Sequence, residues 1–303
     1  MFRHYPYLTK ISLIISSQKK QDSSMKGNLY KPKNPSVAMA VCCMGLIEME
    51  EIDDCNGWFG LIPNGSSNLT ITLNDESIAY HNKEGKALLY ASCKSPVALK
   101  KTKSLKFVNV QFKPYGLYYF TGIPQTNFPN EILSLEDIFS RSEHDELLGR
   151  IYDSKSTLGI FKTIEQFLAD RIQTHLFNDR VNHAVFLMKS NLKISIRELS
   201  EKLCLSTRRF REIFQDTTGF SPSYIRKIER INQSLNKLAL YPGKSLTHVA
   251  IDHHYFDQSH FIKDFKSIAG VTPSQYVKQQ AKISDFYNFY IDDLNTFTSN
   301  MGN

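Results

Sequence analysis

The sequence predicts an α+β protein in which an N-terminal antiparallel β-barrel domain is followed by a helical linker and an all-α domain. Short β-type runs separated by turn residues fill residues 36–112, a pattern typical of a barrel or a sandwich. After residue 129, apolar residues recur at helical spacing. Within 194–277, one helical unit is repeated. The length of 303 residues is sufficient for two domains, each with its own core.

The repeat consists of matching apolar, glycine and proline positions. In the second half of each copy the offset is 51 residues. The matched pairs are Phe210 and Phe261, Phe214 and Phe265, Gly219 and Gly270, and Pro222 and Pro273. In the first half the offset is 50, since Leu199 is matched by Val249. The second copy therefore has one extra residue between its two helices.

Each copy predicts a helix-turn-helix unit, because apolar residues at helical spacing lie on both sides of a short turn. The residues expected in the cores of the two units are Leu199, Leu203, Phe210, Phe214, Val249, Ala250, Phe261 and Phe265. Ser206 and Asp257 are suited to cap the second helix of each unit. An apolar stripe over 225–238 predicts a connecting helix that ends before Pro242 and holds the units on one frame.

The outer faces of the second helices predict DNA binding, because a short helix with guanidinium and amide groups fits the major groove. The side chains expected to contact bases are Thr207, Arg208, Arg211, Glu212, Gln258, Ser259 and Lys263. The side chains expected to contact phosphates are Ser206, Arg209, Lys227, Arg230, Lys244, Thr247 and Lys266. Residues 179–280 carry 16 Lys and Arg against 9 Asp and Glu, whereas residues 1–178 carry 20 against 18. The positive charge is thus concentrated where phosphate binding is expected.

Residues 180–278 resemble the DNA-binding domain of the AraC/XylS family of transcription regulators. The closest matches are LSTRRFREIFQDTTGFSP in the first unit and DQSHFIKDFKSIAGVTPSQYV at the end of the second. The chain departs from the family pattern at His254, where glycine is usual, and at Glu212, where arginine is common. His254 leaves the turn geometry open. Glu212 is expected either to accept a hydrogen bond from a cytosine amino group or to pair with Arg208 or Arg209.

The resemblance implies a sequence-specific regulator of transcription with double-stranded DNA as its partner. It also suggests RNA polymerase, a small-molecule effector and a second copy of the chain as partners. The segments WFGLIPNGSSNLTITLND and QFKPYGLYYFTGIP resemble a divergent sensor domain of one subgroup, which implies a cupin-like barrel. For Trp58, Phe59 and Tyr80, packing in the core of that barrel competes with lining a ligand cavity.

The expected organisation has five parts. Residues 1–35 form an irregular lead-in, 36–140 the barrel, 141–178 the helical linker, 179–280 the DNA-binding domain, and 281–303 a tail that packs back as a helix. In the linker, one helical stripe comprises Leu158, Phe161, Ile164, Leu168 and Ile172. Such a stripe either packs on its own barrel or, as the resemblance suggests, joins two copies of the chain.

Motifs for catalysis and metal binding are absent from the sequence. There is no GxSxG, no glycine-rich phosphate loop and no CxxC, and the His residues of the N-terminal half are widely separated. In the second unit, a structural or DNA-facing role competes with a metal site for His248, His253, His254 and His260. We therefore expect no metal, cofactor or enzymatic activity. An enzyme with a catalytic barrel and a DNA binder without a ligand are the competing interpretations.

The cysteine content and the hydropathy predict a cytoplasmic protein. The five cysteines are odd in number and follow no disulfide or metal spacing, which is typical of a reducing compartment. No run of 18 apolar residues is present, so no membrane span is expected. The apolar patch near the N-terminus is too short for a signal peptide.

Overall fold

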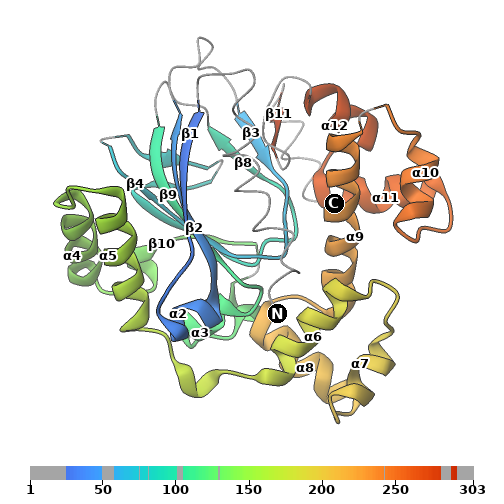
Figure 1. Cartoon of the computed structure of the whole chain (residues 1–303), viewed down its shortest axis with the longest axis horizontal. Helices are drawn as coiled ribbons and strands as arrows, with labels where there is room; N and C mark the ends of the chain where they lie inside the picture. Colours follow the sequence, from blue (N-terminus) through green and yellow to red (C-terminus); the bar gives the residue numbers. More distant parts are fainter. Residues whose placement is uncertain are drawn as a thin grey trace.

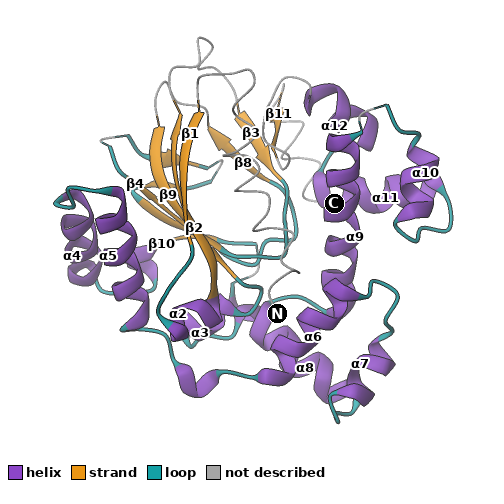
Figure 2. Ribbon diagram, viewed as in Figure 1, coloured by secondary structure: helices purple, strands orange, loops and turns teal. Residues whose placement is uncertain are grey.

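The computed structural model describes residues 25–49, 58–74, 76–80, 82–100, 105–128, 130–241, 243–280 and 288–291. A strand-rich region precedes a helical region, and the two lie side by side (Figure 1 and Figure 2). We refer to 25–140 as the sheet region and to 179–280 as the helical region. None of the described helices combines the length and the apolar content needed to cross a membrane.

Within the described part of the chain, the main sheet contains six antiparallel strands in the order β1-β2-β9-β4-β7-β10. Their bounds are β1 Met25–Tyr30, β2 Val41–Met49, β4 Asn68–Thr72, β7 Ala87–Tyr90, β9 Leu105–Phe112 and β10 Ile132–Ser134. Along β9, the buried Val108 and Val110 alternate with partly exposed residues. In β7 all four residues are buried, with Ala87 and Leu89 in one hydrophobic cluster and Leu88 and Tyr90 in another, so both faces of the sheet are covered at this strand.

The other strands form smaller sheets. β11 (Asn288–Ile291), β3 (Trp58–Leu61) and β8 (Val97–Lys100) make a three-stranded sheet, and β5 (Ile78–Ala79) pairs with β6 (Glu84–Gly85). The described strands thus form separate open sheets. A single closed barrel, as the sequence led us to expect, is not formed by these strands.

Three segments differ from the expectations. Residues 25–30, in the lead-in that we expected to be irregular, form strand β1. This segment is regular because it pairs along its whole length with β2. Residues 36–40, expected in the β-type part of the chain, belong to helix α2 (Pro35–Ala40), since the Asn34 side chain caps it and Pro35 suits its first turn. In the tail, residues 288–291 pair with the edge of β3 as a strand instead of the expected helix. The rest of 281–303 lies outside the described residues.

The linker contains helices α4 (Arg141–Tyr152) and α5 (Thr157–Ala169), which contact each other beside the main sheet (Figure 1). They follow α3 (Gly116–Thr121) and the short 3-10 helices η1 (Gln125–Asn127) and η2 (Leu135–Asp137), and precede η3 (Thr174–Leu176). Of the predicted stripe, the members buried in the core are Phe161, Ile164, Leu168 and Ile172. Leu158 is exposed. Most of the stripe therefore packs within the chain.

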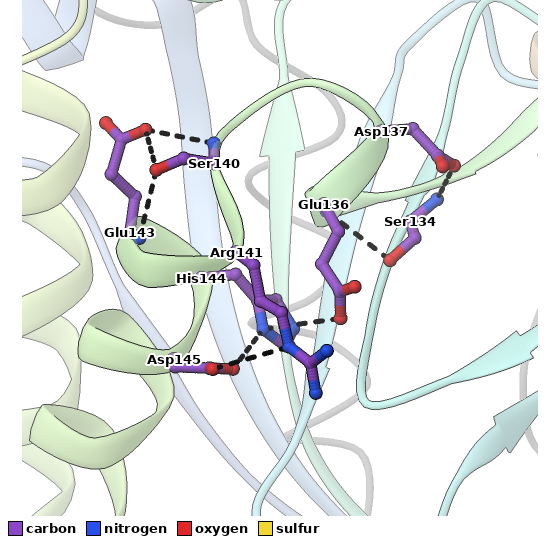
Figure 3. Close-up of polar contacts among 8 residues, drawn as sticks. All are labelled: Ser134, Glu136, Asp137, Ser140, Arg141, Glu143, His144 and Asp145. Atoms are coloured by element: carbon purple, nitrogen blue, oxygen red, sulfur yellow. Dashed lines mark hydrogen bonds and ion pairs between the residues drawn. The ribbon is translucent and has the colours of Figure 1, made fainter.

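Local hydrogen bonds fix the entry into α4 (Figure 3). The Ser140 backbone N–H donates to Glu143, and the Glu143 backbone N–H donates to the Ser140 hydroxyl, which forms a capping box. Ser134 and Asp137 form a second capping box one turn earlier. His144 Nδ1 lies 2.9 Å from an Asp145 oxygen. The two capping boxes stabilise the first turns of η2 and α4.

The described residues of the helical region form seven helices. They are α6 Asp179–Ser190, α7 Ile196–Lys202, α8 Thr207–Thr218, α9 Pro222–Leu240, α10 Leu246–Asp252, α11 Gln258–Ala269 and α12 Pro273–Gln280. Helices α7 and α8 form the first unit, and α10 and α11 form the second. The long helix α9 connects them, with one unit near each of its ends (Figure 1).

Two hydrophobic clusters divide the helical region. The first runs from Tyr30 in the sheet region through the linker helices to Phe210 and Ile225, so the first unit shares its core with the sheet region. The second contains Phe261 and the buried residues of α9 and α12, together with Ile62 and Ala98 from the sheet region. The expectation of a separate core for each domain is therefore wrong, because both clusters combine residues of the helical region with residues of the sheet region, the first cluster more extensively.

Candidate DNA-binding surface

The two units have the same backbone, with one residue inserted in the second turn. α7 and α10 begin at positions 50 apart, whereas α8 and α11 begin at positions 51 apart. Cys204 and His254 occupy equivalent turn positions, and both have a positive φ, 52° and 62° respectively. The left-handed turn at His254 is thus retained without glycine. Since Ser206 and Asp257 both cap the following helix, the inserted residue is Phe256.

The eight residues expected in the cores of the units are all buried. In the first unit, the rings of Phe210 and Phe214 meet edge to face with centroids 5.5 Å apart. In the second, Phe261 and Phe265 repeat this contact at 5.7 Å. Each pair lies four residues apart on one helix face, so the opposite face of α8 and of α11 is free to meet DNA.

The outer face of α8 presents arginine side chains. Arg208, whose side chain is 90% exposed, donates from Nε to Glu212 at 2.9 Å, and Arg209 lies 3.6 Å from the same carboxylate. The hydrogen bond from Arg208 lowers the pKa of Glu212. Glu212 therefore pairs with both arginines, which is the second of the two alternatives expected for it from the sequence. Arg211 is exposed and has no ion-pair partner among the described residues.

The first residue of each recognition helix is held by a hydroxyl group. Thr207 is partly buried, and its hydroxyl lies 3.1 Å from that of Ser200 on α7. In the second unit the Thr247 hydroxyl donates to the Gln258 side-chain oxygen at 2.7 Å. Gln258 is thus oriented with its amide N–H groups free to donate, while Thr207 points partly toward its own unit.

An acidic residue in the second unit forms ion pairs with two of the side chains that were expected to contact phosphates. Asp264 on α11 lies 2.8 Å from Lys227 and 3.6 Å from Arg230, both on α9, and its side chain is only 13% exposed. The Arg230 guanidinium also lies over the ring of Tyr255, 4.7 Å from its centroid. These cations therefore fix α11 against α9. Asp264 occupies the position that is equivalent to Ile213 in the first unit. This replacement of an apolar residue by a carboxylate is the signal in the sequence that could have revealed the ion pairs.

Residues 199–279 match the family described as Helix-turn-helix domain. The XylDLEGF operon transcriptional activator of Pseudomonas putida is 26% identical over 153 residues, which cover 48% of this chain and 47% of that protein. The chain carries the DNA-binding domain of the AraC/XylS family. It spans about half the length of the curated relatives that it matches.

Solved structures that match this chain include ToxT from Vibrio cholerae. That structure is 13% identical, has a TM-score of 0.41, and is matched over 84% of this chain and 98% of its own. A probable AraC family transcriptional regulator from Rhodopseudomonas palustris is 23% identical with a TM-score of 0.32, over 33% of this chain and 96% of its own.

The AraC-type domain is attached to the sheet region along α8 and α9. Ser92 donates to the carbonyl of Thr218, the last residue of α8, at 3.0 Å. Gly219, with φ of 76°, ends this helix, and an added Cβ would lie 2.7 Å from Ser92. On α9, the Tyr224 hydroxyl donates to the carbonyl of Lys94. The helix that carries both units is thus fixed to the sheet region.

A pocket lies between the sheet region and α6, the first helix of the AraC-type domain. Its lining includes Cys42, Gln111 and Lys113 from the sheet region and Asn182 and Lys189 from α6. A hydrogen bond with Cys43 and the neighbouring lysines lower the pKa of the Cys42 thiol to about 7. The pocket thus combines two cations and a thiol at the junction of the two regions.

Tyr80 and Trp58, for which a ligand cavity was the alternative, have packing roles. Tyr80 is buried in a cluster on the main sheet, and Trp58 packs against the core of the second unit. Burial lowers the pKa of His253 to about 4, so it is neutral at pH 7. Lys244 pairs with Asp252 rather than standing free. Within the described residues, no three His, Cys, Asp or Glu side chains come together as a potential metal site.

Proposed function

We propose that this protein is a sequence-specific transcription regulator whose two recognition helices, α8 and α11, read neighbouring segments of the major groove. The observation that carries the proposal is the pair of matched helix-turn-helix units held by one helix, α9. Two such helices on a rigid frame are suited to adjacent turns of DNA.

The proposed base contacts are Thr207, Arg208, Arg211, Glu212, Gln258, Ser259 and Lys263. Arg211 is the strongest of them, because it is exposed without an ion-pair partner and a guanidinium binds guanine in a bidentate manner. Arg208 and Glu212 form one group, since their ion pair must open or turn toward the bases together. Gln258 is held by Thr247 so that its amide donates outward.

The proposed phosphate contacts fall into two groups. Ser206, Arg209, Thr247 and Lys266 are exposed and suited to direct contact. Lys227, Arg230 and Lys244 have carboxylate partners in the chain, so their contribution to phosphate binding is indirect, through the position of α11 and α10.

We further propose that a small-molecule effector acts at the pocket between the sheet region and α6. The pocket has a volume of about 20 Å³, which is room for about one water molecule, so it must widen to admit an effector. Because its lining comes from both regions, a bound molecule would change their contact and thereby the position of the units on DNA. RNA polymerase and a second copy of the chain are the protein partners that we propose.

The test is selection of a binding site from random duplexes by the full chain, followed by affinity measurements over a range of salt concentrations. We expect a preferred site spanning two neighbouring major-groove segments. Lys266→Ala should weaken binding to all duplexes equally and reduce the salt slope by about one unit. Equal binding to all duplexes by the unmodified chain would contradict the proposal.

A further inference from the structure

Phe256 is the most exposed large apolar side chain of the described residues, at 93%. It is the residue by which the second turn exceeds the first, and it directly precedes Asp257, which caps α11 by accepting from the His260 backbone N–H. The first unit has no counterpart. The phenyl ring is therefore placed in solvent at the beginning of a recognition helix.

The turn does not need Phe256 for its own stability. Its neighbour Tyr255 is buried and contacts the ring of Phe261, with centroids 5.3 Å apart. The Tyr255 backbone N–H also donates to the carbonyl of Ala250, as Leu205 does to Ser200 in the shorter turn. Since Tyr255 and Asp257 hold the turn, the Phe256 side chain is available for an external contact.

We propose that Phe256 contacts the 5-methyl group of a thymine in the DNA segment bound by the second unit. The first residues of a recognition helix are those closest to the base edges in the major groove. Thymine presents the one apolar group in that groove, and phenylalanine is among the side chains that contact it. This inference rests on the proposed function and adds a specificity determinant to it.

The position of Phe256 favours DNA over a protein partner. It adjoins Gln258 and Ser259, the proposed base contacts of the same helix end. The other exposed apolar residue of the second unit, Ile251, is 60% exposed and lies on the preceding helix, α10. Ile251 is therefore a matched control, because it offers similar apolar surface away from the first turn of α11.

The experiment uses the full chain and its selected duplex, with each thymine replaced in turn by deoxyuridine, which lacks only the methyl group. We expect one replacement in the half bound by the second unit to weaken binding about fourfold, the factor for one buried methyl group. Phe256→Ala should lose affinity for the parent duplex and become insensitive to that replacement. Ile251→Ala should respond as the unmodified chain does.

Two results would overturn the inference while leaving the proposed function intact. One is a Phe256→Ala variant that keeps the deoxyuridine response of the unmodified chain. The other is a Phe256→Ala variant that binds every duplex as the unmodified chain does but activates transcription less, with the same loss in Ile251→Ala. This result would assign Phe256 to a protein contact. Failure to select any preferred duplex would overturn the proposed function and this inference together. Circular dichroism melting of each variant verifies that the second unit is folded.

Discussion

The two helix-turn-helix units share one backbone but are stabilised and exposed differently. Both have a left-handed residue in the turn and a glycine at the end of the recognition helix. The core of the first unit is continuous with that of the sheet region, whereas the second unit lies in another cluster, which is completed by α9 and α12 and, from the sheet region, only by Ile62 and Ala98 among its buried members. The same motif is therefore coupled strongly to the rest of the chain at one end and more weakly at the other.

Their DNA-facing surfaces differ as well. The first unit presents Arg208, Arg209 and Arg211, while the second presents Phe256 and Lys263 around an internal ion pair at Asp264. The guanidinium groups of the first unit are suited to bind guanine and phosphate, and the apolar side chain of the second unit is suited to contact the methyl group of thymine. On the function that we propose, the repeated scaffold fixes where DNA contacts are made, and the residues that differ between the units decide which bases they favour.

The largest expected effects come from removing the core phenylalanines. Phe210→Ala and Phe261→Ala should each cost about 3–5 kcal/mol of stability, because a buried aromatic ring leaves a cavity. Phe210→Ala should also lower the melting temperature of the sheet region, since their core is shared. Phe261→Ala should act mainly on the second unit.

Trp58 makes this comparison measurable. It is the single tryptophan of the chain and packs against the core of the second unit. In Phe261→Ala, its fluorescence should change at a lower temperature than the circular dichroism of the sheet region. Coincident unfolding of both signals in both variants would contradict the difference in coupling between the units.

The sequence was sufficient for the helical region and less so for the sheet region. The repeat located both turns, the cores and the inserted residue, because packing between two short helices requires apolar residues at fixed spacing. The closure of a barrel depends on pairing between distant strands, which local patterns do not specify, and β1 and β11 were missed for that reason. The engagement of Lys227 and Arg230 by Asp264 is likewise a contact between helices far apart in sequence.

The next largest effect is expected at Asp264. Asp264→Asn retains the shape of the side chain but leaves Lys227 and Arg230 without a countercharge in a largely buried site. We expect a loss of about 2–3 kcal/mol in the stability of the second unit, less than for a fully buried pair because both cations are partly exposed. Denaturant unfolding followed by Trp58 fluorescence measures it. As a control, Glu212→Gln alters an exposed pair and should leave stability nearly unchanged.

A smaller and more selective effect is expected at Arg211. Arg211→Ala should reduce affinity by about 1–3 kcal/mol at one base pair in the half bound by the first unit and relax specificity there. Binding to duplexes with single base-pair changes measures it. Lys263→Ala, on the equivalent face of α11, should alter specificity only in the other half. An equal loss for every duplex would reassign Arg211 to phosphate contact.

The smallest effect is expected from relieving the left-handed residues in the two turns. A non-glycine residue at positive φ is strained by its Cβ, whereas glycine adopts this conformation freely. His254→Gly and Cys204→Gly should therefore each raise the stability by a few tenths to about 1 kcal/mol, since the gain is reduced by the greater freedom of glycine in the unfolded chain. His254→Ala and Cys204→Ala separate loss of the side chain from relief of the backbone, because alanine keeps the Cβ. Chemical unfolding curves of all four variants test whether the turns are equivalent. If His254→Gly destabilised the second unit while Cys204→Gly stabilised the first, the exposed imidazole would have a contact of its own, and the equivalence of the turns would hold for the backbone alone.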